Sequence, residues 1–139
     1  MDHLKRFTDA QETKSTQALA EINAGRKQSH WMWYIFPQIA GLGQSETTVH
    51  YAIQDREEAS AYLQHPVLGA RLIEMSKALL NIQGRSANEI FGKPDDAKLR
   101  SCMTLFSILE NTNPVFKEVL NKYFKGIGDE WTKEILKEL

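Results

Sequence analysis

The chain has 139 residues, of which 42% are hydrophobic, and this matches the usual size of a single domain with one compact core. Its formal net charge of -1 excludes the strong positive field on which non-specific binding to nucleic acid depends. One cysteine cannot form an internal disulfide, no apolar run approaches the roughly 20 residues that cross a membrane, and no secretion or lipidation signal is present. We therefore expect a single domain over residues 1–139, in the cytoplasm and without membrane attachment.

Helical signals begin near the N-terminus. Apolar residues recur at helical spacing and predict a helix over residues 4–24, which Gly25 ends. A second helix is expected over residues 56–65, because Asp55 suits its capping position and Pro66 disfavours its continuation. The same proline suits the start of a third helix, which has the clearest amphipathic pattern in the chain.

The C-terminal half carries further helix starts. A capping box at residues 86–89 predicts a single helical turn, and a longer helix follows Pro94. The next helix begins at Pro114, and Asp129 is expected to cap a last helix that contains Trp131.

The segment between the first and second helices differs from the rest. Residues 34–46 read as a long irregular segment that is rich in aromatic residues and glycine, and residues 47–51 are β-branched or aromatic and favour an extended conformation. One short strand cannot form a sheet. We therefore predict an all-α fold, a compact bundle of about six helices with one long irregular segment, in which a functional loop is expected.

Four long strings carry a family resemblance. They are SHWMWYIFPQIAGLG, AYLQHPVLGARL, IFGKPDDAKLRSCMTLF and FKEVLNKYFKGIGDEWT. Together they resemble the family catalogued as domain of unknown function 1810, and the similarity spans nearly the whole chain. The resemblance implies a small all-helical bacterial-type protein. It implies no activity, although some members carry a calpastatin label for which no calpain-inhibitor motif is visible here.

The segment after the first helix combines cationic and aromatic side chains. Arg26 and His30 can donate hydrogen bonds to a phosphate or a carboxylate, but a charged turn in contact with water has the same composition. Trp31 and Trp33 can form a stacking wall for a ring, or they can fill the core. Both interpretations remain open at the level of sequence.

Further polar residues lie in the helices that start at residues 66 and 94. Arg71, Lys98 and Ser101 can add a second cationic wall if these helices face the aromatic segment. We predict one pocket between the segment at residues 26–45 and these two helices. The expected ligand-binding residues are Arg26, His30, Trp31, Gln38, His65, Arg71, Lys98 and Ser101.

Other motifs carry weaker signals. Residues 41–45 can form an anion-binding nest or a plain turn. No histidine pair has the spacing of a helical metal site, so we expect no metal and no cofactor. Cys102 lies beside an apolar stripe, which favours an inert buried thiol over a nucleophile.

Three functions are compatible with these features. The first is a binding module for a small anionic ligand, phosphorylated or nucleotide-like. The second is an enzyme for hydrolysis or transfer on such a ligand, with His30 or His50 as base and Arg26 or Lys98 stabilising negative charge. The third is a protein-protein interaction domain that uses the aromatic segment as an exposed patch. The catalytic residues and the oligomeric state are not specified by the sequence.

Overall fold

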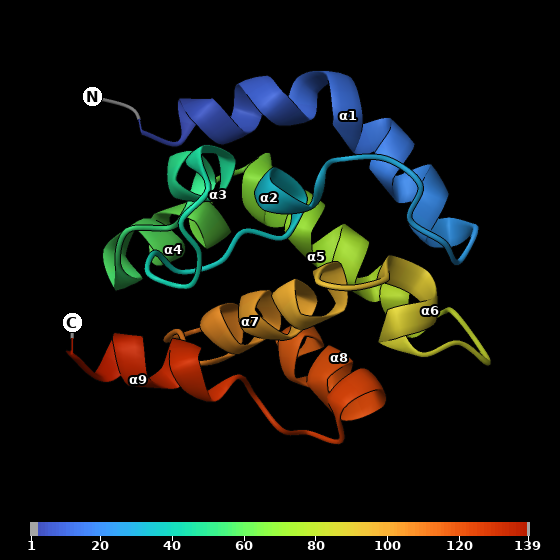
Figure 1. Ribbon diagram of the computed structural model, residues 1–139. Coiled ribbons are helices and arrows are strands. Elements are labelled where there is room, and N and C mark those ends of the chain that lie inside the picture. Colours follow the sequence, from blue (N-terminus) through green and yellow to red (C-terminus); the bar gives the residue numbers. More distant parts are fainter. Residues whose placement is uncertain (1–2, 139) are drawn as a thin grey trace.

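The computed structural model describes residues 3–138, and over this range the chain folds into helices joined by short loops (Figure 1). The nine helices of the described residues are α1 (Lys5–Asn23), α2 (Met32–Ile35), α3 (Glu46–Tyr51), α4 (Arg56–Gln64), α5 (Leu68–Leu80), α6 (Ala87–Phe91), α7 (Asp95–Ser107), α8 (Val115–Phe124) and α9 (Glu130–Glu138). None of them has the length and the apolar character needed to cross a membrane. The predicted all-α class is confirmed, whereas the predicted number of about six helices is too low.

Two of the additional helices are α2, which overlaps the start of the segment predicted to be irregular, and α3, which covers the segment predicted to be extended. The extended conformation predicted for residues 47–51 is wrong, because this segment forms most of α3. The hydroxyl of Ser45 caps α3 by accepting a 3.2 Å hydrogen bond from the backbone N–H of Thr48, and Glu46 lies at the positive end of the helix. This local cap outweighs the β-branched composition, since the segment has no neighbouring strand with which to pair.

Most predicted helix ends agree with the structure. Gly25, which follows α1, adopts a positive φ of 79°, a conformation that glycine takes without strain. The carboxylate of Asp55 caps α4 by accepting a 2.8 Å hydrogen bond from the N–H of Glu58. At α6, both hydrogen bonds of the predicted capping box between Ser86 and Glu89 are present.

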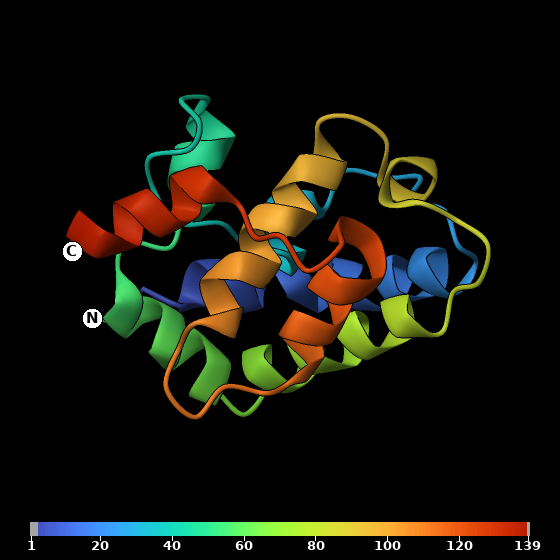
Figure 2. The ribbon, with the colours of Figure 1, turned by 90° about the horizontal axis from the view of Figure 1, so that it is seen from below.

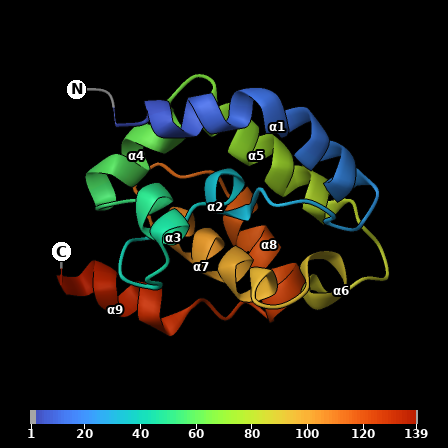
Figure 3. The ribbon, with the colours of Figure 1, turned by 45° about the horizontal axis from the view of Figure 1, so that its top comes forward.

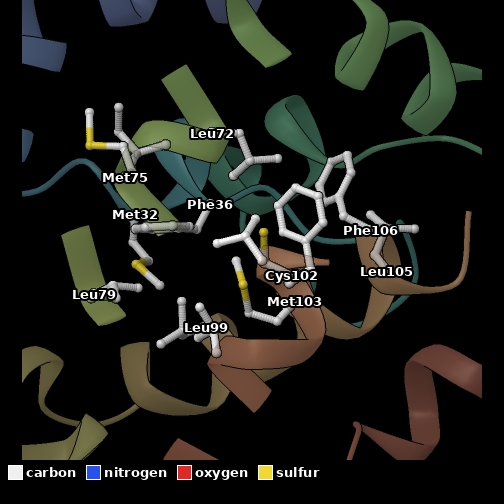
Figure 4. Packing of buried hydrophobic residues seen from close by; sticks show 14 of the residues in the cluster. Met32, Phe36, Leu72, Met75, Leu79, Leu99, Cys102, Met103, Leu105 and Phe106 are labelled. Atoms are coloured by element: carbon white, nitrogen blue, oxygen red, sulfur yellow. The ribbon is translucent and has the colours of Figure 1, made fainter. Parts of the chain in front are cut away.

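The core lies where α5, α7 and α8 pack against one another, with α1 on the outer side of α5. Figure 4 shows Leu72 and Leu79 of α5 pointing toward Cys102 and Met103 of α7. The side chain of Cys102 is fully buried, and this burial raises the pKa of its thiol well above the ordinary value. A protonated, inaccessible thiol agrees with the structural interpretation of this residue.

Gly69, in the first turn of α5, allows α4 and α5 to approach closely. A Cβ atom at this position would lie 1.9 Å from the carbonyl oxygen of Leu63 in α4. Because a backbone oxygen cannot move away as a flexible side chain can, only glycine fits here. The tight corner between α4 and α5 therefore depends on this residue.

The loop at residues 36–45 lies beside α3 and close to α9 (Figures 2 and 3). A single parallel bridge ties it to the chain after α3: the N–H of Ile53 donates to the carbonyl of Gln38, and the N–H of Ala40 donates to the carbonyl of Ile53, both at 2.8 Å. On its other side, a Cβ atom at Gly41 would lie 3.2 Å from the side chain of Ile135 in α9. The loop, α7 and α9 therefore meet at one place on the surface.

Candidate functional site

A hollow of about 270 Å³ lies where this loop, α7 and α9 meet. Three of the eight predicted site residues line it, namely Gln38, Lys98 and Ser101. The remaining wall is formed by Leu42, Gly43, Thr48, Pro94, Ala97, Asp129 and Trp131. We refer to this place as the α7–α9 hollow.

Lys98 is held at the hollow by two neighbours, Asp95 of α7 and Trp33 of α2. Its Nζ atom lies 3.6 Å from Oδ1 of Asp95 and 5.2 Å from the centre of the Trp33 ring. The other oxygen of Asp95 lies 2.9 Å from Nζ of Lys27. Because two lysines share one carboxylate, about one positive charge remains for a ligand, and the aromatic face of Trp33 supports the ammonium group.

Ser101 and Gln38 supply neutral polar groups. Ser101 is buried, with 5% of its surface exposed, and its hydroxyl donates a 3.2 Å hydrogen bond to the carbonyl of Ala97 in the preceding turn. That hydroxyl oxygen can still accept a hydrogen bond. The backbone of Gln38 is fixed by the bridge to Ile53, while its side-chain amide makes no hydrogen bond to any residue in the range 3–138. The amide is therefore free to donate to a ligand and to accept from it.

Asp129 and Trp131 close the hollow from the start of α9. The N–H of Asp129 donates a 2.8 Å hydrogen bond to the hydroxyl of Thr104 in α7, which fixes where α9 begins. Oδ2 of Asp129 accepts hydrogen bonds from the N–H and the hydroxyl of Thr132 at 2.9 and 2.7 Å. Trp131 is 73% exposed, more than any other large hydrophobic side chain among the described residues.

The sequence predicts that Trp131 lies in the last helix but indicates no function for it. Apolar spacing alone does not show that Thr132 and Leu136 form the buried face of α9 while Trp131 points away from it. One feature of the sequence does point to an exposed Trp131: it lies two residues after the capping Asp129, in the first turn of a helix.

Trp31 does not contribute to the hollow. Its side chain is fully buried, and its indole Nε1 donates a 2.9 Å hydrogen bond to the carboxylate of Glu21 in α1. The core interpretation of this tryptophan is the one that the structure supports. Trp33 is half-buried and contacts Lys98 through its ring.

The other predicted site residues lie elsewhere. Nδ1 of His65 accepts hydrogen bonds from the N–H groups that follow it at the start of α5, and the guanidinium of Arg71 lies 3.4 Å from the side-chain oxygen of Gln11 in α1. Arg26 and His30 are exposed in the turn after α1. The expected convergence of all eight side chains on one pocket is therefore not seen, because α4 and α5 carry His65 and Arg71 away from the loop.

The structure gives no geometric support for a catalytic or metal-binding histidine among the described residues. Within residues 3–138, neither His30 nor His50 forms a hydrogen bond or an ion pair with a carboxylate, and the ring of His50 instead packs edge-on against Tyr51. In the same range, no three histidine, cysteine or acidic side chains come together as metal ligands.

A larger groove of about 590 Å³ runs between α1 and α5. Leu19 and Ile73 form part of its floor, and Glu74 and Lys77 contribute opposite charges. It contains none of the predicted site residues, and its charges are balanced. The α7–α9 hollow is therefore the better candidate site.

Comparison with known proteins identifies the family. The family model described as "Protein of unknown function (DUF1810)" matches residues 1–136. The chain belongs to this family. The resemblance inferred from the four long strings is thereby confirmed.

One solved structure extends the DUF1810 assignment. The crystal structure of the conserved hypothetical protein Rv1873 from Mycobacterium tuberculosis is 48% identical in sequence, covers 96% of each chain and superposes with a TM-score of 0.94. No curated protein matches the chain. Since neither DUF1810 nor this relative has a described activity, function has to be argued from the hollow itself.

Proposed function

We propose that this protein is a cytoplasmic binding module for a small anionic ligand that carries a planar ring. The ring packs against Trp131, the anionic group pairs with Lys98, and the side-chain amide of Gln38 orients the polar part. Phosphorylated compounds, nucleotide-like compounds and aromatic carboxylates are the classes to examine.

The observation that carries the proposal is the exposure of Trp131 beside a cation. An indole that is 73% exposed at the edge of a hollow leaves apolar area in contact with water, and covering that area is favourable by about 25 cal/mol per Å². Lys98 and Gln38 lie in the same wall and supply a charge and an unpaired amide. Apolar surface with a few convergent polar groups is the usual composition of a small-molecule site.

The alternatives have less support. Acid-base catalysis would need an oriented base, and no described histidine has a carboxylate partner. An interaction patch built on residues 31–36 would need exposed aromatic side chains, whereas Trp31, Tyr34 and Phe36 are buried. Binding without catalysis is therefore the function that the geometry favours.

A thermal-shift screen tests the proposal. The purified protein is heated with nucleoside phosphates, sugar phosphates, ADP-ribose-type compounds and aromatic carboxylates, since a ligand of the folded state raises the midpoint with concentration. Lys98→Met and Trp131→Leu should abolish the shift. Lys137→Met is the matched control, because Lys137 is an exposed residue of α9 that does not line the hollow.

Two results would overturn the proposal. One is the absence of any concentration-dependent shift across the whole panel. The other is a shift that survives unchanged in both Lys98→Met and Trp131→Leu, because the ligand would then bind at another place. Circular dichroism of each variant verifies that the fold is retained.

A further inference from the structure

The charges that line the α7–α9 hollow cancel. Among the described residues of its wall, Lys98 is the cation and Asp129 is the carboxylate. Behind Lys98, the pair formed by Lys27 and Asp95 adds no net charge. A ligand that enters with one negative charge therefore meets one ammonium group and one opposing carboxylate. Each further negative charge would meet no additional cation.

Some of the backbone donors at the nearby helix starts are already used. The N–H of Ala97 donates to Asp96, and the N–H of Lys98 donates to the carbonyl of Pro94. At the starts of α3 and α9, the N–H groups of Thr48 and Thr132 donate to capping side chains. Phosphate sites usually combine a helix N-terminus with several free N–H groups. At these helix starts the capping side chains therefore occupy part of the donor array that a phosphate would need.

The volume of the hollow gives an independent limit. Ligand pockets typically enclose roughly 300–1,000 Å³, and the α7–α9 hollow of about 270 Å³ lies just below that range. It has room for one small ring system with its substituent. A nucleoside polyphosphate or a dinucleotide would extend beyond Trp131 and Lys98 into solvent.

From the charge balance and the volume, and resting on the proposed function, we infer that the ligand is an aromatic monocarboxylate rather than a phosphorylated compound. The ring lies against Trp131, and the single carboxylate accepts hydrogen bonds from the ammonium of Lys98 and the amide of Gln38. Asp129 acts as the selectivity residue, because its carboxylate disfavours ligands with two or more negative charges.

A matched ligand pair tests this inference. 1-Naphthoate and 1-naphthyl phosphate share one ring system, but at pH 7.5 the first carries one negative charge and the second carries nearly two. Both are titrated into the ¹⁵N-labelled full-length protein, and the indole N–H resonance of Trp131, assigned with Trp131→Phe, reports binding. We expect naphthoate to bind at least about five-fold more tightly, the effect of roughly one uncompensated charge at several ångströms.

The variant Asp129→Asn supplies the control for charge. Asparagine also caps helices well, so α9 should keep its start, and only the negative charge is removed. The preference for naphthoate over naphthyl phosphate should then shrink by about five-fold, because the dianion gains more than the monoanion does. Thermal denaturation of this variant verifies that its stability is retained.

The outcomes separate the two proposals. Tighter binding of naphthoate that is lost in Lys98→Met, with a reduced preference in Asp129→Asn, supports the inference. Equal or tighter binding of naphthyl phosphate to the wild type overturns it but leaves the anion-binding function standing. If neither compound shifts the Trp131 resonance, both the inference and the proposed function fail at this hollow.

Discussion

The carboxylate of Glu21 accepts a hydrogen bond of 2.9 Å from the indole Nε1 of Trp31. The same carboxylate accepts hydrogen bonds from the backbone N–H groups of Gln28 and Ser29 at 2.7 and 3.0 Å, and from the hydroxyl of Ser29. One acidic side chain of α1 thus holds the turn that follows this helix and seats Trp31 in the core. The polar and aromatic residues at 28–31 therefore serve the fold at this point.

Stability between pH 4.5 and pH 2 should depend on Glu21. Partial burial raises its pKa, but the hydrogen bonds from Ser29, Gln28 and Trp31 outweigh this effect and lower the pKa from 4.5 to about 2. The unfolded state therefore binds more protons in this window, so the contribution of Glu21 is fully present above about pH 4.5 and is lost as the pH falls toward 2. Glu21→Gln should lower the free energy of unfolding at pH 7 by about 1.5–3 kcal/mol.

Urea denaturation at a series of pH values checks this prediction. The difference between the wild type and Glu21→Gln should narrow as the pH falls from 4.5 to 2. Glu12→Gln is the control, because Glu12 lies on the exposed side of α1. A constant difference at all pH values would contradict the lowered pKa.

Arg6 and Glu58 form a largely buried ion pair that joins α1 to α4. Their side chains are 15% and 13% exposed, and Nη2 of Arg6 lies 2.7 Å from Oε1 of Glu58. The guanidinium also donates to the carbonyls of His50 and Ala52 at 2.8 and 2.9 Å. Arg6→Met should destabilise the fold by about 2–4 kcal/mol, because it removes a charged donor from a largely buried carboxylate and from the backbone carbonyls beside it.

A double-mutant cycle with Glu58→Gln measures the pair itself. We expect a coupling energy of about 1–3 kcal/mol from chemical denaturation of the wild type, both single variants and the double variant. Strictly additive effects would mean that Arg6 acts only through its hydrogen bonds to backbone carbonyls.

The variant Gly69→Ala shows whether steric contact or helix propensity has the larger effect on stability at this position. Propensity favours alanine over glycine inside a helix by about 1 kcal/mol and so predicts a more stable protein. The contact with the carbonyl of Leu63 predicts the opposite sign, a loss of about 2 kcal/mol or more, because α4 and α5 would have to separate. The melting temperature shows which effect dominates. Ala70→Gly, on the exposed side of the same helix, should cost only about 1 kcal/mol.

Thr104→Val should loosen the start of α9. Thr104 is buried, and its hydroxyl donates a 2.7 Å hydrogen bond to the carbonyl of Arg100 while accepting from the N–H of Asp129. Valine has nearly the same shape but leaves that N–H unpaired, at a cost of about 1–3 kcal/mol. Hydrogen exchange of the backbone amides at Asp129 and Trp131 should accelerate.

Ser107→Ala provides the comparison for this experiment. Within the described part of the chain, the hydroxyl of Ser107 bonds only to the carbonyl of Thr104 in α7, so its removal should leave exchange in α9 unchanged. Equal acceleration in both variants would indicate a general loss of stability in α7 instead of a local link to α9.

Local chemistry explains which parts of the fold could be predicted. Some helix ends depend only on one residue's own side chain or backbone conformation, as at Asp55, Ser86 and Gly25. These ends can therefore be predicted from the sequence. Ser45 and Glu46 carry the same kind of signal. At α3, however, the β-branched residues that follow favour an extended segment, and the cap formed by Ser45 outweighs that preference.

The candidate site was harder to predict because it depends on how the helices are rotated about one another. Lys98 and Ser101 are one turn apart on α7, and their shared face follows from helix geometry. That this face meets Gln38 and Trp131, and that Arg71 lies against α1, follows from tertiary packing. No periodicity within a single helix carries that information.

The burial of Cys102 has a practical consequence. It is the single cysteine of the chain, and its side chain is 0% exposed in the middle of α7. A maleimide can reach its sulfur only after the core has opened, so the rate of covalent labelling at low denaturant measures how often α5, α7 and α8 separate. The native chain thus contains a single labelling site whose reaction rate reports the opening of the core, and no cysteine needs to be engineered into it.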